Sequence, residues 1–276
     1  MKKELPKKKR RKRLLRLAAL LLLFGVFVFS LVMLLKTGIS YVKNRAAYRA
    51  IRSAAEIRET AAPAKEAAFF GPSLPAPSAE PAVTPEPLPV SLDWEALKTV
   101  CPDIVGWLYL EGTGIHYPVV QGTDNEYYLT HNARREENAG GALFLDAGCG
   151  KACRNLIVYG HRMKDDSMFG TLPEYAHKAY LAEHPIMYYL TPEQNYRVEI
   201  FACRTVNAEA KYFTTHFSDD DAYRRYLDKA VEQSYWSAPV PPSAEYNTLT
   251  LVTCSVYEGL QDPRLLVHGR LVPLSS

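Results

Sequence analysis

Residues 248–271 read TLTLVTCSVYEGLQDPRLLVHGRL and contain two β-type runs, TLTLVTC and RLLVHGRL. A glycine and a proline stand between the runs, and both residue types mark turns. Two strands joined by so short a connection are expected to pair as antiparallel neighbours. Because a hairpin brings the end of one strand beside the start of the next, Cys254 and Arg264 should lie close together.

Cys254 ends the first of these strands, at a rim where a rigid support can hold a reactive group. Side chains alternate along a strand, so Cys254 shares a face with Thr250 and Val252. The chain has five cysteines, and an odd number leaves at least one thiol outside any disulfide. A neighbouring arginine can stabilise a thiolate, bind a peptide carbonyl or stabilise an oxyanion. Cys254 is therefore the candidate nucleophile.

A cysteine nucleophile needs a group that takes and returns a proton, and histidine does this most often. Among seven histidines, His161 follows the strand run NLIVYG directly, and Gly160 breaks that strand. Each residue alone has an ordinary explanation: Cys254 as a small buried hydrophobe, Arg264 as an edge-strand charge, His161 without a role. Their combination predicts a catalytic site.

Six further β-type runs, separated by turn signals, precede the hairpin. They are IVGWLYL (104–110), GIHYPVV (114–120), GALFLD (141–146), NLIVYG (155–160), IMYYL (186–190) and YRVEIFACRTV (196–206). So many short strands with brief connections predict an all-β sandwich or barrel over about residues 91–274.

Two helices are expected beside these strands. SLDWEALKTV (91–100) reads as a short helix. A longer helix is predicted over 218–236, with Ser218 as its N-cap and Asp221 completing a capping box. The residues that fall on one face of this helix are Tyr223, Tyr226, Leu227 and Ala230.

Charge is unevenly distributed along the 276 residues. Residues 1–16 contain ten Lys or Arg and one acidic residue, whereas the rest carries 23 basic and 29 acidic side chains, a net charge of about −6. That acidic body argues against a nucleic-acid partner. With 47% hydrophobic and 23% charged residues, the composition fits one or two folded domains and excludes disordered, collagen-like and small disulfide-scaffold proteins.

Residues 17–35 read LAALLLLFGVFVFSLVMLL and contain no charge. As a helix, this run nearly spans a hydrocarbon layer of about 30 Å. The basic residues 1–16 then predict a cytoplasmic tip, with the remainder of the chain outside the cell. A cleaved signal peptide is the competing interpretation, but its apolar part is normally only about 7–15 residues long. A nuclear-localisation or RNA-binding interpretation of KKKRRKR is disfavoured by the adjoining apolar run.

Residues 36–90 are expected to form an extracellular stalk. An Ala-, Arg- and Glu-rich segment from Tyr41 to about Lys65 predicts a helix that continues out of the membrane. Eight prolines follow between Pro63 and Pro89, a composition typical of an extended spacer rather than a folded layer.

Three parts of the sequence resemble class B sortases, the membrane-anchored cysteine transpeptidases of Gram-positive bacteria. These are NLIVYGHRMKDDSMFG, the hairpin quoted above, and DIVGWLYLEGTGIHYPVVQGTDNEYYLTHN with the GALFLD that follows. The resemblance covers about residues 91–272 and includes the helix before the cysteine strand. It implies a mainly β fold: an eight-stranded sortase-like barrel with N-terminal helices, an inserted helix at 218–236 and a preceding transmembrane helix and stalk.

The resemblance also implies roles for individual residues. Cys254 matches the nucleophile that attacks the carbonyl of a threonine in a C-terminal sorting motif and forms a thioacyl-enzyme. His161 matches the acid and base, and Arg264 matches the residue that stabilises the substrate and oxyanion. The implied partners are surface proteins bearing sorting motifs and an amine of peptidoglycan or its lipid-linked precursor, and the chemistry needs no metal or cofactor.

Substrate contacts are implied for four further residues. Asn125 and Leu129, in DNEYYL, match positions that line the sorting-signal groove. Tyr212 and Phe213 lie in the loop that walls this groove before the inserted helix.

Cys149 and Cys153, in CGKAC, leave three interpretations open: a local disulfide, a metal site with His161, or no role. A structural zinc site needs four ligands, and no second pair stands at a suitable spacing, so metal is disfavoured.

Three alternatives to an anchoring transpeptidase also follow from the sequence. The chain could link pilin subunits, or it could be a surface cysteine hydrolase that passes its acyl group to water. A non-catalytic adhesion or scaffold module on a stalk is the third, and that alternative predicts no role for Cys254.

Overall fold

The computed structural model describes residues 7–55, 58–59, 88–150, 152–208, 213–254 and 262–274. The chain divides into two compact units, one ending at Lys43 and one comprising Asn44–Ser276. Helix α1 (Lys7–Ala54) contributes residues to both units.

The first unit contains the apolar run of α1. From Leu17 to Leu35 its large hydrophobic side chains are exposed, with Leu22 and Leu34 each 71% accessible. Within the described ranges, α1 is the one helix long and apolar enough to cross a membrane. A helix that presents leucine and phenylalanine on every side suits a lipid environment rather than water.

The second unit consists of short elements in the following order. They are β1 (Arg58–Glu59), β2 (Val90–Ser91), α2 (Trp94–Val100), β3 (Ile104–Tyr109), β4 (His116–Gln121), α3 (Tyr127–Thr130), β5 (Leu143–Leu145), β6 (Asn155–Tyr159), η1 (Leu172–Ala176), α4 (Lys178–Glu183), β7 (Ile186–Leu190), β8 (Asn195–Asn207), α5 (Asp220–Glu232), β9 (Thr248–Cys254) and β10 (Pro263–Pro273). Each of the eight strands predicted from the sequence is present, and α2 confirms the predicted short helix.

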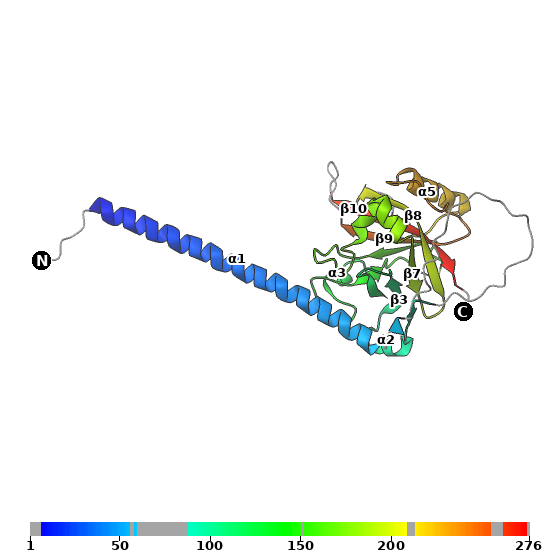
Figure 1. The fold of residues 1–276 in the computed structure, drawn as a ribbon, viewed down its shortest axis with the longest axis horizontal. Helices are drawn as coiled ribbons and strands as arrows, with labels where there is room; N and C mark the ends of the chain where they lie inside the picture. Colours follow the sequence, from blue (N-terminus) through cyan, green and yellow to red (C-terminus); the bar gives the residue numbers. More distant parts are fainter. Residues whose placement is uncertain are drawn as a thin grey trace, which may run out of the picture. The chain divides into compact units, whose positions relative to one another are not determined.

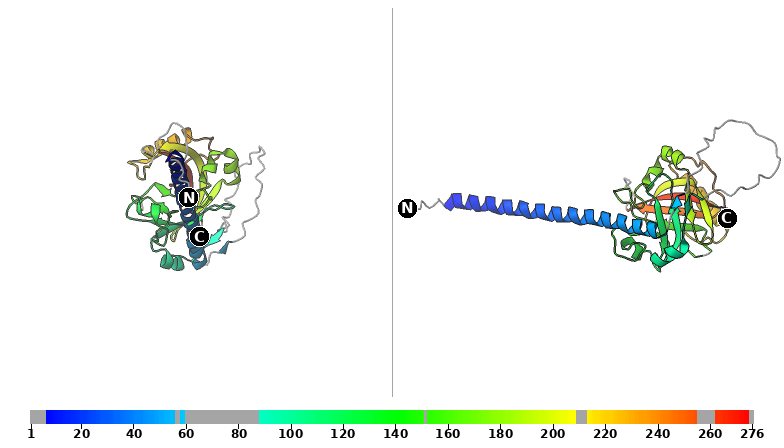
Figure 2. Two further views of the ribbon diagram at one scale, coloured as in Figure 1. Left: turned by 90° about the vertical axis from the view of Figure 1, so that its left-hand side faces the viewer. Right: turned by 60° about the horizontal axis from the view of Figure 1, so that its bottom comes forward.

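Eight strands close into a barrel in the order β10-β8-β7-β3-β4-β5-β6-β9 (Figure 1). The closed barrel decides between the two architectures that the sequence left open. Figure 2 shows the C-terminal strands, coloured orange and red, in the barrel wall. Two neighbouring pairs, β4 with β5 and β6 with β9, are parallel, and the other six are antiparallel.

The barrel interior holds the main hydrophobic core. Along β9, Leu249 and Leu251 belong to this core, as do Leu265 and Val267 of β10. The alternate residues of these strands therefore point to the outer face, which carries Cys254 and Arg264.

Helix α5 covers part of this outer face (Figure 1). Its residues Tyr223, Leu227 and Ala230 are buried against Phe201 and Ala202 of β8, as the predicted helical face requires. The predicted cap is wrong by one residue. Asp219, rather than Ser218, caps the helix by accepting a hydrogen bond from the Ala222 amide at 2.7 Å. A carboxylate at this position also complements the positive helix N-terminus, and Ser218 instead donates to Asp219.

The folded unit begins before residue 91, the start expected from the sequence. Tyr48, Ile51 and Ala55 are buried and belong to the same hydrophobic cluster as the core residues of the barrel strands. The Tyr48 hydroxyl donates a 2.7 Å hydrogen bond to the carbonyl of Gly141. Part of the segment predicted as stalk therefore belongs to the folded unit. Residues 60–87, the proline-rich part, lie outside the described residues.

Gly141 lies where a side chain cannot fit. Its φ is +58°, and a Cβ would stand 2.5 Å from the Tyr128 carbonyl oxygen and 2.8 Å from that of Leu129. We expect Gly141→Ala to lower the free energy of unfolding by about 2–4 kcal/mol, because left-handed backbone strain adds to overpacking against backbone. Urea unfolding measures this loss.

Gly150→Ala is the matched control, because a Cβ at Gly150 meets nothing within 4 Å. Its expected change is within about 0.5 kcal/mol. Equal stability of the two variants would show that the Gly141 turn relaxes without cost.

Candidate active site

The five cysteines have distinct states in the structure. Cys149 and Cys153 form a disulfide, Cys101 and Cys203 are buried thiols, and Cys254 is an exposed thiol. Burial raises the pKa of the Cys101 thiol to about 12 and raises the pKa of the Cys203 thiol further. Because the thiolate is the nucleophile, these two buried residues are inert near neutral pH. Cys254 is the thiol that an external substrate can reach.

Arg264 lies directly opposite Cys254 on the neighbouring strand. Strands β9 and β10 pair antiparallel, with Arg264 aligned to Cys254. Directly opposed residues of an antiparallel pair point to the same face, with Cβ atoms about 4.5–5.5 Å apart. The predicted hairpin proximity is confirmed.

His161 lies on the other side of Cys254. Strand β6 runs parallel to β9, and the last aligned pair is Tyr159 with Val252. Continuing both chains by two residues brings His161 level with Cys254. Two bonds hold this continuation: the Gly160 amide donates to the Val252 carbonyl at 3.1 Å, and Thr253 Oγ1 donates to the Gly160 carbonyl at 2.8 Å.

Three adjacent chain segments therefore form the candidate site, and each contributes one reactive side chain. The thiol of Cys254 is central, the imidazole of His161 lies beyond β6 and the guanidinium of Arg264 lies at the start of β10. A nucleophile flanked by a proton carrier and an oxyanion donor can transfer an acyl group.

The imidazole of His161 is anchored by a backbone group. Its Nε2 lies 2.7 Å from the carbonyl oxygen of Leu129, at the end of α3. A carbonyl only accepts hydrogen bonds, so Nε2 carries the hydrogen and Nδ1 is the nitrogen that gains or loses a proton. Sequence reasoning missed this partner, because a backbone carbonyl has no residue signature.

Arg264 is oriented by Asp262, which the sequence analysis did not single out. Nη1 and Nη2 of Arg264 both donate to the Asp262 carboxylate, the latter at 2.9 Å. Such a fork fixes the guanidinium plane. Strand alternation gives no signal for this pair, because Asp262 precedes β10 and has a positive φ of 49°.

The four residues expected to line a substrate groove have different surroundings. Leu129 is 39% exposed, and Phe213 packs on Ile157 and Val252 of the outer face. The Asn125 amide is occupied within the protein: Nδ2 donates to Asp146 at 2.9 Å and Oδ1 accepts from the Ala147 amide at 2.8 Å. Tyr212 lies outside the described residues.

The Cys149–Cys153 disulfide selects one of the three interpretations left open for CGKAC. Both residues are buried, with exposed fractions of 6% and 2%. A thiolate pair is therefore not available to hold a metal with His161.

Residues 108–272 match the sortase domain family. This match covers more than half of the chain. The chain belongs to the sortase family. It is 36% identical over 178 residues to sortase B of Listeria monocytogenes, covering 64% of this chain and 72% of that protein. It is also 29% identical over 184 residues to sortase B of Staphylococcus aureus, covering 66% of this chain and 75% of that protein.

Solved structures agree with this assignment. The structure of sortase B from Bacillus anthracis in complex with AAEK1 superimposes with a TM-score of 0.66 at 30% identity, over 85% of this chain and 99% of that one. These relatives make the chain a class B sortase, a cysteine transpeptidase enzyme.

Membership in this family establishes the general cellular location and the general kind of partner. Sortases are cell-surface enzymes that act on surface proteins, and the apolar helix α1 of this sortase fits a membrane anchor. The predicted class, enzyme type and barrel fold are confirmed.

Proposed function

We propose that this sortase cleaves a C-terminal sorting motif after a threonine and transfers the threonine carbonyl to an amine of peptidoglycan or its lipid-linked precursor. The observation that carries the proposal is the register of three neighbouring segments, which sets Cys254 between His161 and Arg264. Cys254 is the nucleophile, His161 the acid and base, and Arg264 the oxyanion and substrate donor.

In the first half-reaction, the Cys254 sulfur attacks the threonine carbonyl carbon. A C–S bond forms and the C–N bond of the scissile peptide breaks. His161 Nδ1 takes the thiol proton of Cys254 and passes it to the departing amine, so that the thioacyl-enzyme remains. The bond to the Leu129 carbonyl holds the imidazole in one orientation, so the transferred proton is the one on Nδ1.

In the second half-reaction, an acceptor amine attacks the thioester. His161 takes the amine proton, the new C–N bond forms and the C–S bond breaks, and the proton passes from His161 to the departing sulfur, which restores the Cys254 thiol. Covalent catalysis of this kind replaces one difficult displacement by two easier ones.

Arg264 is proposed to donate to the oxygen on which negative charge develops. Within the described residues, its hydrogen-bond partners are Asp262 and the Pro263 carbonyl, through Nη1 and Nη2 only. Nε–H and one N–H of Nη2 therefore remain for a substrate oxygen. Because Asp262 balances the charge of Arg264, the contribution rests on directed hydrogen bonds rather than on net charge.

The substrate classes draw support from two similar solved structures. One is a Staphylococcus aureus sortase B-substrate complex, with a TM-score of 0.62 at 29% identity over 66% of this chain and 85% of that one. Another is sortase B complexed with triglycine, at the same TM-score and identity. Along the groove, Leu129 and Phe213 are proposed to contact the sorting motif, and Asn125 is proposed to shape the loop beside it.

The orientation in the membrane is also part of this proposal. The basic tip, residues 1–16, would stay in the cytoplasm and the barrel would face the wall, as the positive-inside bias favours. The same orientation brings the enzyme to surface proteins and to wall precursors.

Acyl transfer with and without an added amine tests the proposal. The full chain in detergent is incubated with fluorogenic peptides that vary the residues around a central threonine, with or without triglycine. We expect cleavage after threonine, with product joined to triglycine when the amine is present. Mass spectrometry of the products distinguishes the transferred from the hydrolysed fragment.

The outcome also separates the alternative functions. Identical hydrolysis products with and without triglycine would replace the proposal by a surface hydrolase. With a protein subunit added in place of triglycine, transfer to that subunit and not to triglycine would favour the pilin-linking alternative.

A further inference from the structure

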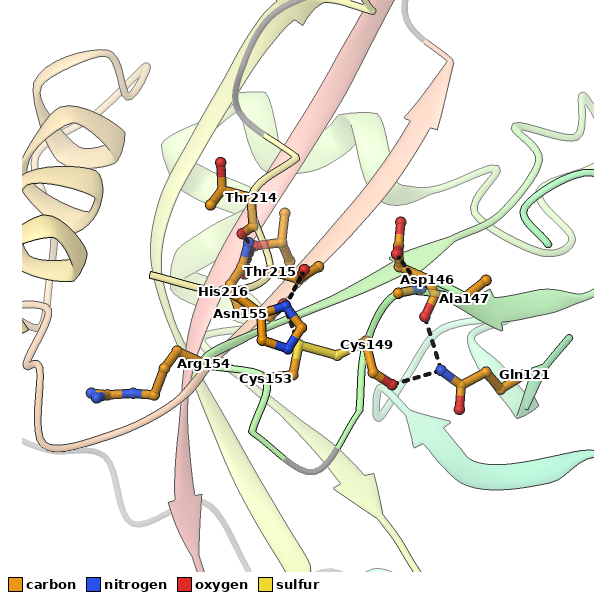
Figure 3. The surroundings of a disulfide bond; sticks show 12 residues. Gln121, Asp146, Ala147, Cys149, Cys153, Arg154, Asn155, Thr214, Thr215 and His216 are labelled. Carbon is orange, nitrogen blue, oxygen red and sulfur yellow. Dashed lines mark hydrogen bonds between the residues drawn. A yellow bond between two sulfur atoms is a disulfide. The ribbon is translucent and has the colours of Figure 1, made fainter. Parts of the chain in front are cut away.

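The disulfide between Cys149 and Cys153 lies in the loop between β5 and β6, residues 146–154 (Figure 3). The proposed chemistry makes no use of it. It lies between Gln121 and Asp146 on one side and Asn155, Thr214 and Thr215 on the other (Figure 3).

On the first side, the loop is bound to β4 and to the residues before α3. Gln121 Nε2 donates to the carbonyls of Asp146 at 2.9 Å and Cys149 at 2.8 Å. The Asp146 carboxylate accepts hydrogen bonds from Asn125 Nδ2 and from the Tyr159 hydroxyl, each at 2.9 Å. Burial, together with the Asp146 charge, raises the pKa of Tyr159, which keeps this hydroxyl a donor.

These contacts connect the loop to His161 through two chain segments. Tyr159 is two residues before His161 on the same segment. Asn125 is four residues before Leu129, whose carbonyl accepts the His161 Nε2–H bond. Asp146 therefore joins the segment that carries the imidazole to the segment that anchors it.

On the second side, the loop is bound to the segment before α5. The Arg154 amide donates to the Thr215 carbonyl at 3.0 Å, and Asn155 Nδ2 donates to the Thr214 carbonyl at 2.9 Å. The adjoining Phe213 ring lies 6.3 Å from the Tyr159 ring, centroid to centroid. This segment forms the other border of the outer face that holds Cys254.

We propose that the Cys149–Cys153 disulfide is a positioning element for acyl transfer, which holds the two borders of the active-site edge at a fixed separation. The Cys149 carbonyl is bound to Gln121 of β4, and Cys153 directly precedes the residues that are bound to the segment before α5. The covalent bridge stops these halves of the loop from separating. The inference rests on the proposed function and adds to it two positioning residues.

The double variant Cys149→Ser/Cys153→Ser tests this role in the full chain. We expect kcat to fall about tenfold with a smaller change in KM, because a displacement of about 1 Å at a proton carrier is costly for catalysis. Two further readouts separate positioning from stability: a shift in the pH profile of kcat, and a change in the ¹H–¹⁵N signal of His161 Nε2–H.

Reduction of the folded wild-type chain provides a second measurement if the double variant does not fold. Dithiothreitol supplies two electrons and two protons, the disulfide becomes two thiols, and the reductant becomes its cyclic disulfide. We expect kcat to fall by the same factor while circular dichroism is unchanged, and to return on reoxidation. The double variant should not respond to reductant, whereas Cys101→Ala, which keeps the disulfide, should respond as wild type does.

Different results would contradict the positioning role and the proposed function. Wild-type kcat, pH profile and His161 signal in the double variant would overturn the positioning role. Loss of the barrel's circular dichroism on reduction would also overturn it, in favour of a purely structural bond. An oxidised wild-type chain that transfers no acyl group would instead contradict the proposed function itself.

Discussion

Replacing Cys254 with alanine is expected to lower acyl transfer by a factor of about 10⁵ or more while the barrel stays folded. No other cysteine can replace it, because the other four are buried as thiols or joined in the disulfide. The Cys254 side chain is exposed, so its removal leaves no cavity, and we expect a stability change within about 0.5 kcal/mol. Product formation and urea unfolding measure the two quantities.

Cys203→Ala is the matched control for this variant. Its thiol is fully buried, so we expect a loss of about 1 kcal/mol of stability with activity retained. The two substitutions thus distinguish a loss of stability from a loss of acyl transfer. Transfer by Cys254→Ala at more than about a thousandth of the wild-type rate would remove Cys254 from the mechanism.

Replacing His161 with alanine is expected to lower kcat by about 10²–10⁴-fold, the usual contribution of general acid–base catalysis. The cost in stability should be small, because the lost bond joins exposed atoms and water can replace it. Steady-state kinetics and urea unfolding measure the two quantities.

His177→Ala serves as the control, because His177 is exposed at the junction of η1 and α4, outside the three site segments. It should keep the wild-type kcat. If His161→Ala retained more than about a tenth of the wild-type kcat, another group would have to carry the proton.

The sequence predicted the strands of this fold well, because strand alternation and turn residues are local signals. The pairing of Cys254 with Arg264 followed from one hairpin, in which nine residues separate the two positions. By contrast, the parallel pairing of β6 with β9 joins residues more than 90 positions apart, such as Val158 and Leu251. No local pattern specifies that pairing, since it depends on barrel closure.

The misplaced start of the folded unit has a different physical origin. Tyr48, Ile51 and Ala55 lie on one helical face, which is an amphipathic signal. In a helix that continues from a membrane span, the same pattern is consistent with a stalk. Only the tertiary contact with the barrel distinguishes the two.

The supporting contacts of the site were the least predictable part. The Leu129 carbonyl holds His161, and the Asp146 carboxylate joins Asn125 to Tyr159. A backbone carbonyl has no side-chain signature, and an aspartate in a loop has many possible partners. Such contacts become visible only when the loops are placed in space.

The central claim is that Cys254 carries the substrate as a thioester between two half-reactions. The full chain is incubated with a threonine-containing peptide that it cleaves, without added amine, then quenched in acid, digested and analysed by mass spectrometry. We predict that the peptide's N-terminal part, ending in threonine, is attached to the fragment containing Cys254 and is released by triglycine. Consumption of the peptide with no adduct, or with an adduct on another residue, would contradict the account.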